Sequence, residues 1–441
     1  MQPLAIVGGG LAGCECAFAL AGAGIPVTLF EMKPGRFSPA HENPCLAELV
    51  CSNSFRSDAP DSAVGLLKEE MRGLGSLTMR LAAETRLPAG KALAVDRGLF
   101  AQGMTRAVAD HPRITLIRRE ISGLDDPLLD PFGTVVIAVG PLPGEGLAAS
   151  LAGRAGREHL HFYDAIAPIV DAASVDQSVA FPGARHAGDT PDYLNCPLTR
   201  EEYHAFRQAL LNGQRTAPRP FEAETHFEGC LPVETLAERG EMALAFGPLK
   251  PVGFLDPRSG KRPFALLQLR AENVNRTMFN LVGCQTKLTQ PEQARIFRLV
   301  PGLERAEFVR FGSMHRNTFL HAPLTLREDL ALRADPRFFL AGQITGVEGY
   351  VESAASGLWL GLSLAAAIAG GHLPPPPPET ALGALLGHLR TPARNFQPSN
   401  IQYGLMPEPG QKIKRADRRR AYTERARKAF LAWRNIRANS Y

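Results

Sequence analysis

The sequence predicts an α/β protein in which a discontinuous Rossmann-like domain carries an inserted α+β domain. Three observations lead to this prediction. A short apolar strand enters a glycine-rich turn at residues 4–13, a second buried strand ends on glycine at residue 140, and a strand, a glycine-punctuated loop and an apolar helix follow at 337–369. Strands that end on glycine-rich turns are typical of the carboxyl edge of a doubly wound sheet.

The N-terminal unit is expected to be a strand, a turn, a helix and a second strand. Leu4–Val7 is too short for a helix and suits a buried strand. Residues 8–13 form a G-x-G-x-x-G turn, in which the first glycine permits the tight turn, Gly10 lets the backbone approach a pyrophosphate and Gly13 lets the helix pack on the strand. The helix should end near Gly22, and its N-terminus offers free N–H groups to phosphates.

Glu31 narrows the choice of dinucleotide. It ends the second strand, Val27–Phe30, and lies 23 residues after Gly8, where a carboxylate accepts hydrogen bonds from a ribose. The same carboxylate would repel the 2′-phosphate of NADP, which leaves NAD or FAD. The loop at 32–36 is expected to close over the adenosine end of the cofactor.

The C-terminal part favours FAD. Residues 337–342 restore the sheet pattern, the loop at 343–350 is rich in glycine, and a helix is expected over 351–369. This loop and helix N-terminus would lie against the isoalloxazine and the pyrophosphate, completing a cradle begun at the N-terminus. The strand at 134–140 would end beside it.

The remaining chain sets the domain boundaries. A helical pattern runs from 65 to about 86, a further helix is expected at 99–109, and a strand at 114–117 that continues beside 118–121. Mixed strands and Pro/Gly turns after residue 190 indicate the inserted domain. We therefore expect an FAD-binding domain in two parts, 1–190 and 326–441, with an inserted α+β domain at 191–325 and a basic helix at 418–434.

Composition and charge exclude several classes of protein. The 441 residues contain no run of eighteen apolar residues and no leader before the first strand, so neither a membrane span nor a signal peptide is expected. Seven cysteines without paired metal-ligand spacing predict no metal site and reduced thiols in a cytoplasm. The net charge is +5, but residues 411–441 contribute +9, which leaves −4 elsewhere and suggests a polyanionic partner such as nucleic acid.

Two cysteines stand outside recognisable core patterns. Cys51 opens a polar loop, and Cys230 lies on a turn between Gly229 and Pro232. With a flavin, two such thiols could form a redox dithiol, or one could add covalently to an electrophilic base. The residues alone leave both open.

Several motifs closely resemble the folate- and FAD-dependent tRNA (uracil-5-)-methyltransferases over essentially the whole chain. They are the turn at 8–13, Cys-Ser-Asn-Ser-Phe-Arg at 51–56, Phe-Glu-Gly-Cys-Leu-Pro-Val-Glu at 227–234, the segment 280–289 and the segment 341–350. The last is shared with larger flavoproteins that modify the wobble uridine of tRNA. Those carry a further C-terminal tRNA-binding region, for which this chain is too short.

The resemblance implies a reaction and its partners. The substrate is tRNA, methylated at the T-loop uridine at position 54; methylenetetrahydrofolate supplies the carbon, FAD the electrons, and NADPH or NADH regenerates the flavin. Cys230 would attack uracil C6, with Cys51 as its partner, although the sequence does not settle which does which. Lys287, His315 and Arg316 could lower a thiol pKa, or bind folate glutamate or RNA phosphate. No obligatory protein partner is expected.

The predicted cofactor-binding residues come from all of these segments. They are Gly8, Gly9, Gly10, Leu11, Ala12, Gly13, Glu31, Met32, Lys33, Arg36, Ser52, Asn53, Ile121, Ala138, Val139, Gly140, Gly342, Gln343, Gly349, Tyr350, Glu352 and Ser353. Three alternative functions are a flavin-dependent wobble-uridine enzyme, a dithiol–FAD oxidoreductase and an RNA-binding flavoprotein that senses redox state.

Overall fold

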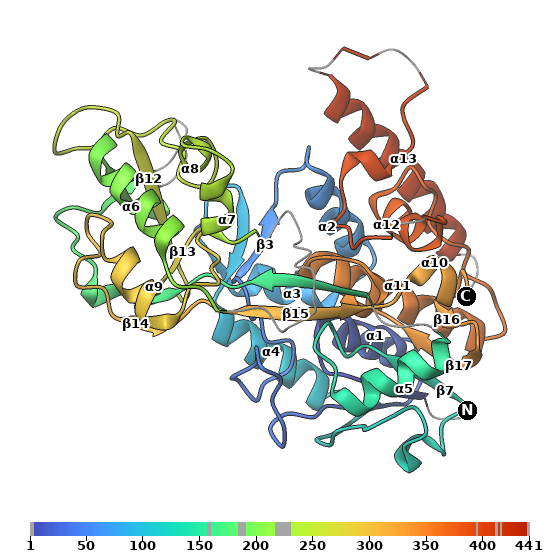
Figure 1. The fold of residues 1–441 in the computed structure, drawn as a ribbon. Helices are drawn as coiled ribbons and strands as arrows, with labels where there is room; N and C mark the ends of the chain where they lie inside the picture. Colours follow the sequence, from blue (N-terminus) through green and yellow to red (C-terminus); the bar gives the residue numbers. More distant parts are fainter. Residues whose placement is uncertain are drawn as a thin grey trace.

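The computed structural model describes residues 4–156, 160–183, 191–216, 231–393, 396–410, 413–414 and 417–438. Its elements form two lobes (Figure 1). One lobe holds a mostly parallel sheet between helices, and the other holds an antiparallel sheet. The predicted α/β class is confirmed.

The first lobe is organised around a six-stranded sheet with β1 near its centre. The order is β16-β17-β7-β1-β2-β6, and every pair is parallel except β16 with β17. β17 comes from the far end of the chain, yet Phe338 lies opposite Val135 of β7, which confirms the discontinuous sheet. The strands are β1 (Leu4–Val7), β2 (Val27–Phe30), β6 (Ile114–Ile117), β7 (Thr134–Ile137), β16 (Ala331–Leu332) and β17 (Asp335–Leu340).

Helices cover both faces of this sheet, and they come from both ends of the chain. The first part contributes α1 (Leu11–Gly22), α2 (Ala63–Gly73), α3 (Leu77–Glu84), α4 (Arg97–Ala109), η1 (Pro127–Leu129) and α5 (Glu145–Ala155). The last part contributes α10 (Ala322–Thr325), η4 (Gln343–Thr345), α11 (Tyr350–Ile368), α12 (Ala381–Arg390), η5 (Tyr403–Leu405) and α13 (Arg418–Ala438).

Two local expectations are wrong. The helical pattern of 65–86 is divided into α2 and α3, because Gly75 takes a φ of 82° and the Ser76 side chain caps the new helix by accepting from Met79 N. Residues 118–121 form no strand.

The two ends of the chain meet where α1 packs on α11. A Cβ on Gly357 would overlap the carbonyl oxygen of Ala12, and one on Gly361 would lie 2.8 Å from the carbonyl oxygen of Cys16. The helix backbones therefore approach more closely than side chains would allow. α11 has the length and apolar composition of a membrane span, but it is mostly buried in this core.

The second lobe is a six-stranded antiparallel sheet with the order β10-β11-β12-β13-β9-β14. Its strands are β9 (Ile169–Asp171), β10 (Phe181–Gly183), β11 (Tyr193–Leu198), β12 (Ala265–Ala271), β13 (Met278–Leu281) and β14 (Phe308–Arg310). Its helices are η2 (Ala172–Ser174), α6 (Arg200–Asn212), α7 (Val233–Glu238), α8 (Ala243–Phe246) and α9 (Gln290–Phe297). The sheet therefore includes β9 and β10, which precede residue 191. Segments from both sides of residue 191 pack into one hydrophobic core.

Two smaller sheets join the lobes. β8 (Leu160–Ala165) pairs antiparallel with β15 (Met314–Phe319), and the pair runs between the lobes (Figure 1). β3 (Ser54–Ser57), β5 (Ala92–Val95) and β4 (Arg86–Leu87) form a three-stranded sheet beside the second lobe. The chain after Cys51 therefore lies at the junction of the two domains.

The close contact of α1 with α11 predicts the effect of adding one methyl group. Gly357→Ala should lower the free energy of unfolding by about 1–3 kcal/mol, because the helices must separate. Gly387→Ala in α12 is the control: no atom lies within 4 Å of its Cβ position, so the better helix propensity of alanine should stabilise the protein slightly. Thermal unfolding measures both. Equal shifts for the two variants would contradict the close contact.

Candidate functional site

A cleft opens at the carboxyl ends of β1, β2 and β7. It contains about 1130 Å³ of empty space, part of it open to solvent, which is room for a large organic ligand. The predicted residues that line it are Gly8, Gly9, Gly10, Leu11, Ala12, Glu31, Met32, Lys33, Ile121, Ala138, Val139, Gly140, Gly342, Gln343, Tyr350 and Ser353. Segments from both ends of the chain thus meet around one cavity.

The glycine-rich turn is shaped by its surroundings. Gly8 has a φ of 105°, and a Cβ there would lie 2.5 Å from the carbonyl oxygen of Ala138. A Cβ on Gly13, which does not line the cleft, would overlap the carbonyl oxygen of Gly8. Gly10 differs, because the nearest atom to its Cβ position is the Ala138 oxygen at 4.0 Å. The turn needs glycine at 8 and 13 for packing, whereas Gly10 faces free space at the N-terminus of α1.

Glu31 is buried, and it binds the backbone of the turn. Its Oε2 accepts from Gly9 N at 2.7 Å, and its Oε1 accepts from Lys33 N at 2.9 Å. Each carboxylate oxygen can accept a second hydrogen bond, so these contacts leave acceptors for a ribose. The ribose contact stays a prediction. The bonds to the backbone are a second role that the sequence did not indicate.

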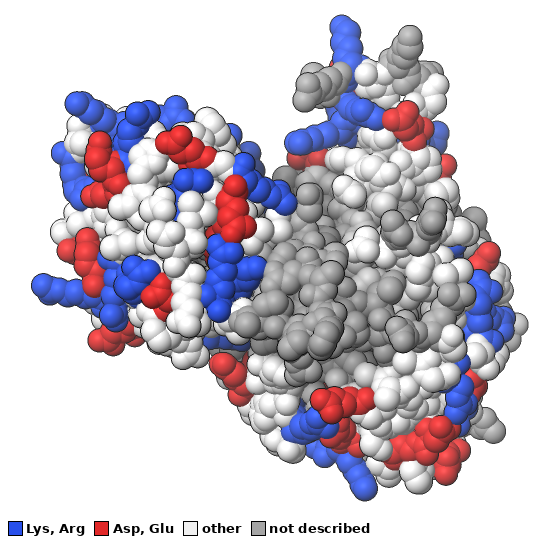
Figure 2. Space-filling view, in the orientation of Figure 1, with Lys and Arg blue, Asp and Glu red and all other residues white. Residues whose placement is uncertain are grey.

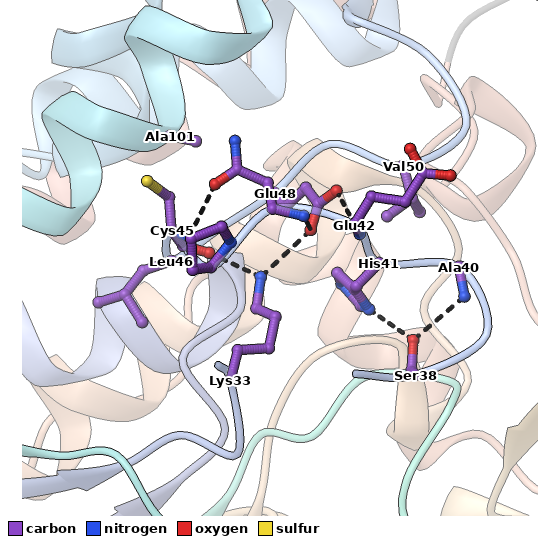
Figure 3. A network of polar contacts seen from close by, with 12 residues as sticks. Lys33, Ser38, Ala40, His41, Glu42, Cys45, Leu46, Glu48, Val50 and Ala101 are labelled. Carbon is purple, nitrogen blue, oxygen red and sulfur yellow. Dashed lines mark hydrogen bonds and ion pairs between the residues drawn. The ribbon is translucent and has the colours of Figure 1, made fainter. Parts of the chain in front are cut away.

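The ammonium group of Lys33 holds the neighbouring loop (Figure 3). Lys33 Nζ donates to Cys45 O at 2.6 Å and lies 3.3 Å from Glu48 Oε2. Glu48 also accepts from Glu42 N and Asn43 N, at 3.0 and 3.1 Å. The buried ion pair therefore folds residues 42–48 against the cleft.

Sequence reasoning missed several residues of the cleft wall. They are Val7, Phe30, His41, Ala47, Glu48, Val50, Arg119, Glu120, Pro141, Leu142, Pro143, Gly144 and Leu147. The signal that could have found residues 141–147 is their position after the strand that ends at Gly140. The 41–50 segment carried no such signal, because a long-range polar network places it.

Five other predicted residues lie outside the cleft wall. Arg36 pairs with Glu120 at 2.6 Å on the surface. Asn53 is buried, and with Ser52 it contacts the second domain. Glu352 is buried and forms an ion pair with Arg56. Gly349 lies next to this pair and also does not line the cleft. Their predicted contacts with a cofactor stay predictions.

Cys51 lies beside the cleft. Its Sγ is 3.1 Å from the hydroxyl oxygen of Tyr350, and its backbone N donates to the same oxygen at 2.8 Å. Burial, and then the neighbouring Cys51, raise the pKa of Tyr350 well above its usual value, although Arg97 opposes this. The phenol therefore stays protonated at neutral pH, and Tyr350, which contacts the Cys51 thiol, lines the cavity.

Cys230 lies outside the described residues, as does the first part of its motif. The described end of that motif contacts the 280–289 segment. Glu234 accepts from Lys287 N at 2.6 Å and from the Thr286 hydroxyl at 3.0 Å, and Val233 N donates to Gln285 O at 2.7 Å. Burial raises the pKa of Glu234, which these hydrogen bonds oppose. Two motifs far apart in sequence are therefore side by side.

The possible cationic neighbours of the thiols are only partly described. Lys287 is largely buried beside Glu234 in this motif pair. His315 and Arg316 lie on β15, and their side chains are outside the described residues. The three assignments stay predictions.

Comparison with known proteins adds three findings. The family described as "Glucose inhibited division protein A" matches residues 3–372. The methylenetetrahydrofolate--tRNA-(uracil-5-)-methyltransferase TrmFO of Oleidesulfovibrio alaskensis is 64% identical over 429 residues, covering 97% of this chain and 96% of that protein. The protein of the same name from Geobacter sulfurreducens is 55% identical over 430 residues, covering 97% and 98% of the two chains.

Among solved structures, Aquifex aeolicus GidA has a similar fold. The TM-score is 0.67 at 15% identity, and the match covers 97% of this chain and 73% of GidA. At this identity the likeness supports the two-domain architecture alone.

Proposed function

This chain belongs to the methylenetetrahydrofolate--tRNA-(uracil-5-)-methyltransferases within the glucose inhibited division protein A family, and from this premise we propose how its residues serve that reaction. The protein is a methylenetetrahydrofolate-dependent tRNA (uracil-5-)-methyltransferase. The observation that carries this conclusion is 64% identity to such an enzyme over nearly the full length of both chains. The T-loop uridine at position 54 is the proposed target.

The cleft fits FAD as its cofactor. The open position beside Gly10 leaves space for a pyrophosphate at the N-terminus of α1, and Glu31 keeps acceptors for the adenosine ribose. Gly342, Gln343 and Tyr350 would border the isoalloxazine on the opposite side. When bound, FAD supplies the electrons that convert the transferred methylene group to a methyl group. NADPH or NADH is the proposed source of those electrons and would dock transiently, because the sequence holds no second G-x-G-x-x-G turn.

The two cysteines take the roles that the family implies. Uracil C5 is a poor nucleophile until a thiolate adds to C6, and Cys230 is the proposed nucleophile. Cys51 is its proposed partner, and would either remove the C5 proton or protect the one-carbon group before its transfer. The position of Cys51 next to the cleft, against Tyr350, supports this role. Reduced thiols at Cys14, Cys16, Cys45, Cys196 and Cys284 support the proposed cytoplasmic location.

α13 is the proposed tRNA-binding helix. Tyr422, Ala426, Phe430 and Trp433 form a buried stripe that packs on the first domain, and Trp433 Nε1 donates to Pro374 O at 2.9 Å. The polar face is turned outward: the side chains of Arg418 and Arg420 are 54% and 71% exposed. Figure 2 shows Lys and Arg side chains on this end of the molecule and, mixed with Asp and Glu, on the other lobe. A duplex RNA arm could contact both.

The direct test is methyl transfer to unmodified tRNA. Protein reduced with NADPH and supplied with labelled methylenetetrahydrofolate should place label on one T-loop uridine. Cys230→Ala should remain yellow and folded but transfer none, because the thiolate that activates uracil is absent. Nuclease mapping of the product locates the label. Label at a wobble uridine, or turnover of thiol reagents without RNA, would instead support one of the alternative enzymes.

The open space at Gly10 predicts selective loss of flavin. Gly10→Val should fold, because its Cβ meets no protein atom closer than 4.0 Å, but the side chain would occupy the pyrophosphate position. We expect loss of most bound FAD, seen in the absorption spectrum, with a nearly unchanged circular dichroism spectrum. Gly22→Ala, at the other end of α1 where no atom lies within 4 Å, is the control and should keep its flavin. Full flavin content in Gly10→Val would argue against the proposed orientation.

The exposed arginines of α13 predict a salt effect on tRNA binding. Replacing Arg418, Arg419 and Arg420 by Ala should weaken affinity and lower the slope of log K against log salt by up to about 2.7, since each lost phosphate contact removes about 0.9. Replacing Arg106 and Arg113, which are also exposed but lie on and after α4, should leave the slope unchanged. An identical slope in the α13 variant would show that this face is only solvated.

A further inference from the structure

The peptide before Cys51 is bound by an arginine from each domain. The carbonyl oxygen of Val50 accepts from Arg97 Nη1 at 3.2 Å and from Arg310 Nη1 at 2.9 Å. Arg310 also donates through Nη2 to the carbonyl oxygen of Ala40 at 3.1 Å. Arg97 begins α4 of the first domain, whereas Arg310 ends β14 of the second. One carbonyl oxygen therefore joins both domains to the residue next to the thiol.

The two residues after Cys51 are bound by another arginine of the second domain. Arg270 of β12 is buried, and it donates from Nε to Asn53 Oδ1 at 2.8 Å and from Nη2 to Ser52 Oγ at 2.7 Å. Asn53 donates in return to the carbonyl oxygen of Ala271 at 2.9 Å. Ser52 and Asn53 were expected to bind the cofactor, but here their side chains attach the turn to the inserted sheet.

Arg97, the third arginine at this turn, also binds the second domain. Arg97 Nε donates to Glu272 Oε2 at 3.0 Å, and the preceding residue, Asp96, accepts from Val274 N at 3.0 Å. Burial lowers the pKa of Arg97, but Glu272, Tyr350 and Cys51 more than offset this, so its pKa lies above the usual value. Arg97 therefore stays charged.

We propose that Arg270 and Arg310 are positioning residues that hold the Cys51 turn, so that the second domain keeps this thiol in its reactive place beside the cleft. The proposal rests on the proposed function, in which Cys51 takes part in methyl transfer. Neither side chain is among those that line the cleft. Their effect passes through residues 50, 52 and 53, which flank the thiol on both sides.

The geometry also specifies why arginine is needed. Arg270 and Arg310 each reach two acceptors with two nitrogens of a planar group, which the single ammonium of lysine cannot reproduce. Loss of the Arg270 fork removes the donor to the buried Asn53 Oδ1, and loss of the Arg310 fork leaves Arg97 alone on the carbonyl oxygen of Val50. Either loss frees the turn to shift. A displacement of about 1 Å in a reacting group can slow a reaction on the order of 100-fold.

The test compares arginines that each donate through two nitrogens but hold different parts of the chain. Arg270→Gln, Arg310→Gln and Arg270→Lys should each lower kcat for tRNA methylation by about 10- to 100-fold. The KM for tRNA, the bound FAD and the rate of flavin reduction by NADPH should stay as in the wild-type protein. Ser52→Ala, a smaller change on the other side of the same hydrogen bond, should lower kcat in the same direction.

Arg298→Gln is the control for loss of a two-nitrogen arginine contact elsewhere in the second domain. Arg298 also forms a fork, from Nε and Nη2 to the carbonyl oxygen of Ala306, at 3.2 and 2.9 Å, but this contact lies wholly within the second domain. Its replacement should cost stability without the loss of kcat. The proposal is overturned if Arg270→Gln and Arg310→Gln lower kcat no more than the control, if Arg270→Lys restores it, or if only the KM for tRNA rises. Absence of methylation by the wild-type protein would overturn the proposed function itself, and this inference with it.

Discussion

The contact between α1 and α11 is the constraint on which the cleft depends. α1 follows the first strand and its glycine-rich turn, and α11 follows the last loop of the cavity wall. Gly357 and Gly361 let the two helix backbones approach until a Cβ on either would collide with backbone atoms of α1. Because the helices lie so close, Gly342 comes against Ala12, and the segments at 8–12 and 342–353 can border one cavity. The second domain is inserted between the two parts of the first domain. It leaves this contact intact, provided that the insertion begins and ends near the same edge of the sheet.

Buried ionisable side chains fix the loops that the helices cannot reach. Glu70 accepts from the backbone N of Ala381 and Leu382, at 2.8 Å each, and so caps α12; burial raises its pKa to about 8. Lys68 donates to the carbonyl oxygens of Phe55 and Arg56, within the motif that follows Cys51, and burial lowers its pKa to about 8. Lys33 and Glu48 form a buried ion pair that holds the loop on the other side of the cleft. A buried ionisable group is tolerated only with hydrogen-bond or charge partners, and so each of these residues prescribes the conformation of the segment that it binds.

The sequence predicts the parts of this architecture that depend on local pattern. The strand, turn and helix at the N-terminus follow from apolar runs and glycine spacing, and the return of the sheet at 337–342 follows from the same signals. The division of α2 from α3 was missed, because the helical pattern runs through Gly75, whose φ of 82° is not visible in hydrophobic periodicity. Most of the expected cleft residues do line the cavity. Ser52 and Asn53 do not, because their partner, Arg270, is more than 200 residues away and belongs to the other domain.

The glycine-rich turn and the turn at Cys51 differ in what fixes their conformation. The glycine-rich turn takes its conformation largely from the strand, turn, helix and second strand at the N-terminus, including the bond from Gly9 N to Glu31. The turn at Cys51 has no such autonomy: its backbone and side chains satisfy their hydrogen bonds through Arg97, Arg270 and Arg310. Its conformation is therefore a property of the docked pair of domains. The Cys51 thiol is held beside the cleft only when the surface of the second domain is also in place, so the interface between the domains sets its position.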